Sequence, residues 1–213
     1  MSRRLPVYLL IDTSGSMSGE PIEQVRIGIQ MLVSALRQDP YALETACLSV
    51  ITFGSEAKVA VPLTDLTAFQ TPVLEATGTT AMGAALKLAV EQAEREVSKT
   101  TSSSKGDWRP MLFLMTDGRA TDDLEAGLVR FKAYKWGVTV ACAVNGADES
   151  ALEAFAAGAT VKLDTSNQGS MAAFFKWVSA SVGTVSMAVE KSGKEVMGLD
   201  QLPPPPPEIQ VVV

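Results

Sequence analysis

With 213 residues, 46 % of them apolar, the chain can bury one sizeable core, and we expect a single domain followed by a tail. Its formal net charge of −6 argues against a sequence-independent nucleic-acid binder, because such proteins neutralise phosphates with clustered Lys and Arg. The sequence contains no histidine, which excludes a Ser-His-Asp triad, a Cys-His pair and zinc sites built on histidine.

The predicted elements begin with a strand at residues 5–11, which is a continuous apolar run. A helix follows, because apolar residues recur at helical spacing from Ile22 to Leu36. Pro40 comes soon after this pattern and is interpreted as the stop signal of the helix.

The next two predicted strands, 46–53 and 57–61, are separated by Gly54-Ser55-Glu56. A connection this short indicates a hairpin, so the second strand is expected at an antiparallel edge of the sheet. Lys58 within that strand and Pro62 after it would protect the edge against aggregation.

The second half of the chain continues this alternation of helices and strands, interrupted by a polar surface loop at residues 98–107. Helices are predicted at 81–88, 124–131, near 148–157 and at 171–182, and strands at 110–115, 138–144 and 160–163. Strands that alternate with helices form βαβ units. The sequence therefore predicts an α/β fold with a doubly wound, mostly parallel central sheet and one antiparallel edge strand.

The C-terminal part differs in composition, since five consecutive prolines precede a short strand-like end in LPPPPPEIQVVV. We therefore expect a domain at residues 1–186 and a tail at 187–213. The proline run fits a spacer and an interaction motif equally well.

Cys47 and Cys142 both lie inside predicted strands, where cysteine acts as a small buried hydrophobe, and we expect free thiols. About seven apolar residues follow Arg4, which is too short a run for a secretory signal peptide. We expect no other segment to provide the ~20 apolar residues of a membrane span. The expected location is therefore the cytoplasm, without membrane contact.

Three loops follow predicted strands or precede predicted helices, and each carries oxygen-bearing side chains. They read Asp12-Thr13-Ser14-Gly15-Ser16, Thr77-Gly78-Thr79-Thr80 and Thr116-Asp117-Gly118. In a doubly wound sheet such loops meet outside the carboxyl ends of the strands, where ligands bind. We expect these three loops to converge on one site.

An oxygen-only donor set without histidine favours Mg²⁺, with Mn²⁺ or Ca²⁺ as alternatives. Asp12 and Asp117 supply two negative charges, whereas the hydroxyls are neutral. If one aspartate coordinates only through water, the cation keeps net positive character. Such a cation would attract a carboxylate from a protein partner.

The Asp-x-Ser-x-Ser run, the distant Gly-Thr-Thr and the Thr-Asp-Gly loop together resemble the metal-ion-dependent adhesion site (MIDAS) of von Willebrand factor A domains. The resemblance covers roughly residues 5–186. It implies a metal-dependent protein-interaction module whose metal site comprises Asp12, Ser14, Ser16, Thr80 and Asp117. The family often has Gly-Gly-Thr in the second loop, where this chain has Gly78-Thr79-Thr80, so Thr79 is the alternative to Thr80.

The opening RRLPVYLLIDTSGSM and the ending LPPPPPEIQVVV are similar to TerY-type bacterial proteins linked to tellurite resistance and stress. That resemblance implies a cytoplasmic context and partners that include a kinase and a PP2C-like phosphatase.

Three other readings of the Asp12 loop stay open. The loop could be a structural turn that caps the first helix, or the chain could be a scaffold without metal. A metal-dependent hydrolase or phosphatase using Asp12 is a further alternative, although Ser14 stands where a second, acid/base aspartate would be needed. We predict a binding module and not an enzyme. Asp122 and Asp123 are expected to supply an N-cap and first-turn negative charge for the third helix.

Overall fold

The computed structural model describes residues 3–144, 147, 152, 155, 160–163 and 169–212. In this part of the chain one central sheet has the strand order β3-β2-β1-β4-β5-β6-β7. The strands are β1 (Leu5–Asp12), β2 (Ala46–Phe53), β3 (Ala57–Asp65), β4 (Met111–Thr116), β5 (Val138–Val144), β6 (Thr160–Leu163) and β7 (Ile209–Val212).

Strands β2, β1, β4, β5 and β6 run parallel, as the alternation of strands and helices predicted. Each residue of β1 and of β4 is buried, which explains their continuous apolar sequences. β1 pairs with β2 on one side and with β4 on the other, so the strand order reverses at β1. The carboxyl ends of β1 and β4 are therefore where this topology places a ligand site.

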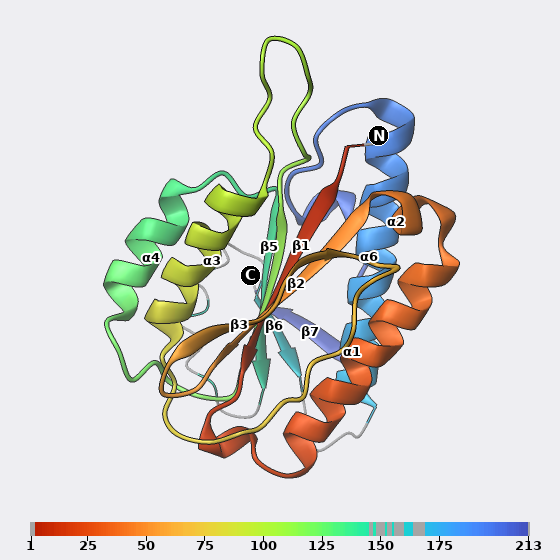
Figure 1. The fold of residues 1–213 in the computed structure, drawn as a ribbon. Helices are drawn as coiled ribbons and strands as arrows, with labels where there is room; N and C mark the ends of the chain where they lie inside the picture. Colours follow the sequence, from red (N-terminus) through yellow and green to blue (C-terminus); the bar gives the residue numbers. More distant parts are fainter. Residues whose placement is uncertain are drawn as a thin grey trace.

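Helices cover both faces of the sheet, as Figure 1 shows, with α3 and α4 on one face and α1, α2 and α6 on the other. Their bounds are α1 (Glu20–Gln38), α2 (Pro40–Thr45), α3 (Met82–Glu96), α4 (Leu124–Ala133) and α6 (Ser170–Ser192). The doubly wound α/β architecture is thus confirmed. The helix predicted near residues 148–157 lies outside the described residues, apart from Leu152 and Phe155, which are buried.

α1 ends at Gln38, just before Pro40, as predicted, and Pro40 is also the first residue of a second helix, α2. The Asp39 carboxylate caps this short helix by accepting from the amides of Tyr41 at 2.9 Å and Ala42 at 3.1 Å. Proline suits the first helical position because its missing amide hydrogen would have no partner there. The end of the first helix was therefore predicted, whereas the short helix α2 was not.

The hairpin of β2 and β3 is antiparallel and forms one edge of the sheet, as predicted. However, β3 continues through Pro62 to Asp65 instead of ending before it. The pairing register shifts between Leu48 and Val50, opposite this part of β3. A bulged edge strand tolerates a residue without an amide hydrogen, so proline does not end β3.

The tail completes the other edge of the sheet, because β7 pairs antiparallel with β6. Helix α6 continues to Ser192, so the expected boundary at residue 186 lies inside a helix. A short 3₁₀ turn, η2 (Leu199–Gln201), precedes the prolines, and the Trp177 indole donates to the Pro203 carbonyl at 2.8 Å. The predicted strand-like end is confirmed, whereas its pairing on this sheet as a second antiparallel edge was not anticipated.

α6 was not expected to resemble a membrane span, yet it is the helix of the described residues that is long and apolar enough to cross one. Its best window has a mean hydropathy of 1.3, and 61 % of that window is buried in the protein. Gly28 of α1 allows close contact with α6, because a Cβ there would lie 2.0 Å from Phe175 Cδ2. Packing against α1 therefore accounts for much of its apolar face. Cys47 and Cys142 are buried free thiols, as predicted.

Candidate metal centre

Asp12 ends β1 with its side chain fully buried. Its Oδ1 accepts from the Ser14 amide at 2.8 Å, and its Oδ2 accepts from the Thr116 hydroxyl at 2.5 Å. Thr116 is the last residue of the neighbouring strand β4, so this contact joins two of the three predicted loops. The Thr116 hydroxyl also accepts from the Gly118 amide at 3.2 Å.

A chain of hydroxyls connects Asp12 to the rim of the sheet. The turn after β1 is a short 3₁₀ helix, η1 (Gly15–Met17), which brings the Ser14 and Ser16 hydroxyl oxygens within 3.0 Å of each other. The Ser16 hydroxyl then donates to Asp117 Oδ1 at 2.7 Å. Ser14 is buried and Ser16 is exposed, so the polar cluster opens from the core toward solvent.

Thr80 and Thr79 lie differently with respect to this cluster. Thr80 is 5 % exposed, and a Cβ added to Gly118 would lie 3.2 Å from its Oγ1 and 3.8 Å from Asp12 Oδ2. Glycine at position 118 therefore leaves room between the Thr80 hydroxyl and the Asp12 carboxylate. Thr79 is exposed, and its amide donates to the Ser55 hydroxyl at 3.2 Å, on the β2–β3 hairpin.

The second and third loops are fastened to each other by backbone and hydroxyl contacts that the sequence did not reveal. The Thr80 amide donates to the Thr121 hydroxyl at 3.0 Å, and the Thr121 amide donates to the Thr80 carbonyl at 2.9 Å. The only feature of the sequence that could have indicated these contacts is the run of polar residues after β4. These contacts fix Thr80 relative to the loop that carries Asp117.

Asp123 caps α4 through the Ala126 amide at 3.0 Å, as predicted. Asp122 was expected to serve the same helix, but it instead caps α3, where its carboxylate accepts from the amides of Gly83 at 2.9 Å and Ala84 at 2.7 Å. The expectation for Asp122 was therefore wrong. These hydrogen bonds of Asp122 hold the third loop against the start of α3, the helix that follows Thr80.

The electrostatics of Asp12 favour a cation. Burial raises the pKa of its carboxyl group, and the nearby Asp117 carboxylate raises this pKa further, against hydrogen bonds from Thr116 and Ser14 that lower it. Within the described ranges, no Lys or Arg forms an ion pair with Asp12. A buried carboxylate is costly unless a positive charge compensates it.

The donor set fits a hard divalent cation better than a cysteine- or histidine-bound one. All five predicted residues lie on the three converging loops, and each offers oxygen. They are Asp12, Ser14, Ser16, Thr80 and Asp117. Only two carry charge, and the described part of the chain contains no cluster of three or more His, Cys, Asp or Glu suited to a metal ion. Neutral oxygens around one or two carboxylates are typical of Mg²⁺ sites.

Comparison with known proteins agrees with this architecture. The family model of the von Willebrand factor type A domain matches residues 7–175. An uncharacterized protein of Synechocystis sp. is 33 % identical over 123 residues, which cover 54 % of this chain and 26 % of that protein. The chain thus spans about a quarter of the length of this curated relative.

Two solved structures share the fold at low sequence identity. A von Willebrand factor type A protein of Catenulispora acidiphila is 17 % identical, with a TM-score of 0.67, and the match covers 86 % of this chain and 43 % of that one. Proximal thread matrix protein 1 of the mussel byssus, with a zinc-occupied MIDAS motif, is 18 % identical, with a TM-score of 0.58. That match covers 83 % of this chain and 46 % of the mussel protein.

Proposed function

Because the chain belongs to the von Willebrand factor type A domain family, whose members are generally metal-dependent protein-interaction modules, we propose the following function. The protein binds one divalent cation on its three converging loops and uses that cation to hold a carboxylate of a partner protein. The proposed metal site comprises Asp12, Ser14, Ser16, Thr80 and Asp117.

The buried carboxylate of Asp12 is the observation that carries this proposal. It lies between β1 and β4 with hydrogen bonds from Ser14 and Thr116 but without a cationic partner among the described residues. A buried charge in that state destabilises the fold unless a cation binds beside it. The alternative of a cap on the first helix does not account for this arrangement, because α1 has Gly19 at its N-cap and no side-chain cap hydrogen bond.

The residues of the site would divide the work between core and rim. Asp12 and Ser14 are buried and would fix the inner side of the site, whereas Ser16 is exposed and would face the partner. A bound cation supplies a Lewis-acidic point that accepts an anionic oxygen. Asp117 receives the Ser16 hydroxyl hydrogen bond, which would hold its carboxylate in place at the edge of the site.

Mg²⁺ is the proposed cation, with Mn²⁺ and Ca²⁺ as the alternatives. Two carboxylates and three hydroxyls match the preference of Mg²⁺ for a few charged ligands supplemented by neutral oxygen and water. The mussel relative has zinc in its MIDAS motif, which supports a divalent cation on this fold without deciding its identity here.

A hydrolase that uses Asp12 as a nucleophile is the competing function. Both carboxylate oxygens of Asp12 already accept hydrogen bonds, and the side chain is fully buried, so it is poorly placed to attack a substrate. Ser14 occupies the position of the acid/base aspartate that such an enzyme would need. The proposal predicts no turnover of p-nitrophenyl phosphate in Mg²⁺ beyond that of Asp12→Ala.

We propose a biological setting from the similarity of both ends of the sequence to TerY-type bacterial proteins. The module would then act in the bacterial cytoplasm, in tellurite resistance or another stress response, with a kinase and a PP2C-like phosphatase among its partners. The RRLPVYLLID opening and the LPPPPPEIQVVV ending support this setting.

The test of the function is selection of a displayed library of random peptides on the immobilised protein in Mg²⁺, followed by elution with EDTA. The proposal predicts that EDTA releases peptides enriched in Asp or Glu, and that Asp12→Ala retains none of them. Binding that survives EDTA would instead identify a scaffold that works without metal. Thermal unfolding of Asp12→Ala confirms that the variant is folded.

A further inference from the structure

A cavity of about 490 Å³ adjoins the proposed metal centre. It lies between the tip of the β2–β3 hairpin and the segment at residues 73–77. The lining residues that matter below are Thr13, Glu56, Lys58, Val73, Glu75 and Thr77. Nothing in the proposed function uses this space.

The cavity shares its walls with the metal loops. Thr13, which stands between Asp12 and Ser14, accepts from the Thr77 amide at 2.8 Å through its carbonyl. The Gly15 amide donates to the Gly78 carbonyl at 3.0 Å, so the 73–80 segment is fastened along the first metal loop. The cavity therefore lies next to the loop that carries Asp12, Ser14 and Ser16.

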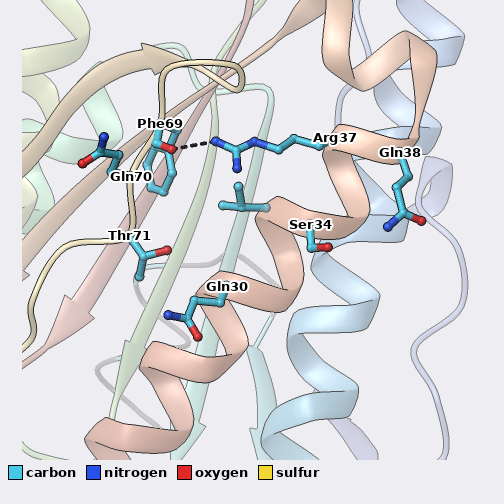
Figure 2. Close-up of a pocket in the computed structure, with 8 residues that line it drawn as sticks. Gln30, Ser34, Arg37, Gln38, Phe69, Gln70 and Thr71 are labelled. Carbon is cyan, nitrogen blue, oxygen red and sulfur yellow. Dashed lines mark hydrogen bonds between the residues drawn. The ribbon is translucent and has the colours of Figure 1, made fainter.

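The wall at residues 73–77 is anchored before any partner binds. Leu74 is 7 % exposed and packs in the core, and the Ser18 hydroxyl donates to the Ala76 carbonyl at 3.1 Å. Just before this wall in the chain, Arg37 of α1 donates to the Phe69 carbonyl at 2.7 Å, as Figure 2 shows. A fixed wall lowers the entropic cost of binding.

Val73 and Glu75 flank the buried Leu74, and both are exposed and line the cavity. Val73 is 83 % exposed, and Glu75 is exposed and makes no hydrogen bond or ion pair to any residue that the structure describes. Lys58, a positively charged residue that also lines the cavity, forms an ion pair with Glu56, with 3.4 Å between Lys58 Nζ and Glu56 Oε2. The wall therefore offers an apolar surface next to an unpaired negative charge.

From this arrangement we propose that the cavity receives a Lys or Arg side chain of the partner, a few residues from the carboxylate that binds the cation. The aliphatic part of that side chain packs on Val73, and its charged group pairs with Glu75. This inference rests on the proposed function, since the metal-bound carboxylate positions the partner. The partner segment thus carries one acidic and one basic residue.

The test compares peptides selected in Mg²⁺ and eluted with EDTA on the wild type, on Glu75→Lys and on Glu91→Lys. Glu91 is exposed on α3 and does not line the cavity, so its variant is a matched charge change. Lys and Arg should be enriched near the acidic residue with the wild type and Glu91→Lys, and not with Glu75→Lys. A peptide selected on the wild type should bind Glu75→Lys about fivefold more weakly, with unchanged Mg²⁺ affinity.

Acidic peptides without enrichment of Lys or Arg over the unselected library would overturn this inference and leave the proposed function intact. The same holds if Glu75→Lys and Glu91→Lys retain identical peptides. If EDTA releases nothing that Asp12→Ala does not also retain, the proposed function fails and this inference fails with it.

Discussion

The Ser16 hydroxyl donates a 2.7 Å hydrogen bond to Asp117 Oδ1, although 101 positions separate the two residues in the sequence. Ser16 belongs to the turn after β1, and Asp117 follows β4. Because β1 and β4 are adjacent parallel strands, their carboxyl ends bring these loops together. The contact shows that the first and third loops form one polar cluster.

Ser16→Ala should weaken Mg²⁺ binding about tenfold without destabilising the protein. The hydroxyl is exposed and serves the polar cluster, so its loss leaves the core unchanged. Calorimetric titration measures the affinity, and thermal unfolding measures the stability. Ser102→Ala, an exposed serine of the loop at 98–107, is the matched control and should bind as the wild type does. Equal Mg²⁺ affinity in both variants would show that Ser16 does not contribute to the metal site.

Thr80→Ala should reduce metal affinity, whereas Thr79→Ala should not. Thr80 is buried with its hydroxyl near Gly118 and Asp12, while Thr79 contacts Ser55 on the hairpin. The two variants delete the same group from adjacent residues, so each controls for the other. Competition between Mg²⁺ and a fluorescent chelator gives both affinities. A loss of metal affinity confined to Thr79→Ala would show that Thr79, and not Thr80, is the ligand from the second loop.

Asp12→Asn should stabilise the metal-free protein at neutral pH and abolish its response to Mg²⁺. Burial raises the pKa of Asp12 in the folded state, so folding favours the protonated carboxyl. That contribution is complete below the unfolded pKa and is lost as the pH rises through the folded pKa.

In EDTA, the melting temperature of the wild type should therefore fall relative to Asp12→Asn as the pH rises from acid to neutral. Each kcal/mol of difference corresponds to about 2–4 °C in a chain of this size. Added Mg²⁺ should close the gap at neutral pH. If the melting temperatures of the two proteins change with pH in parallel, Asp12 does not carry an uncompensated charge.

A chain truncated after Leu202 should have a melting temperature at least about 5 °C below that of the full chain. It loses β7, the contact between Trp177 and Pro203, and the burial of Ile209, which alone is worth roughly 1.5–3 kcal/mol. Trp177→Phe removes this hydrogen bond and part of one buried ring but keeps β7, and should cost less. If differential scanning calorimetry finds equal melting temperatures for the truncated and full chains, the tail does not stabilise this sheet.

The strands were the most predictable part of the fold. The apolar runs at 46–53 and 138–144 coincide with β2 and β5, because strands buried in a parallel sheet are apolar throughout. Two proline signals were incomplete for physical reasons. Pro40 follows the end of α1, as predicted, but also begins α2, and Pro62 lies within a bulged edge strand.

Long-range pairings were beyond sequence reasoning. The strand-like end of the tail was recognised, but nothing in its residues specifies β6 as its neighbour. The metal residues could be proposed from motif spacing and family resemblance, and the structure brings all five onto converging loops. The contacts that position them, such as Asp122 on α3 and Thr121 with Thr80, depend on where the loops meet in space.

Calorimetric titration of chelator-stripped protein with Mg²⁺, Mn²⁺ and Ca²⁺, beside Asp12→Ala, tests the central claim most directly. The account predicts saturable binding of one ion per chain to the wild type, and none to a folded Asp12→Ala. Wild-type protein that binds none of the three ions, or an Asp12→Ala variant that binds them equally well, would contradict a metal centre on these loops.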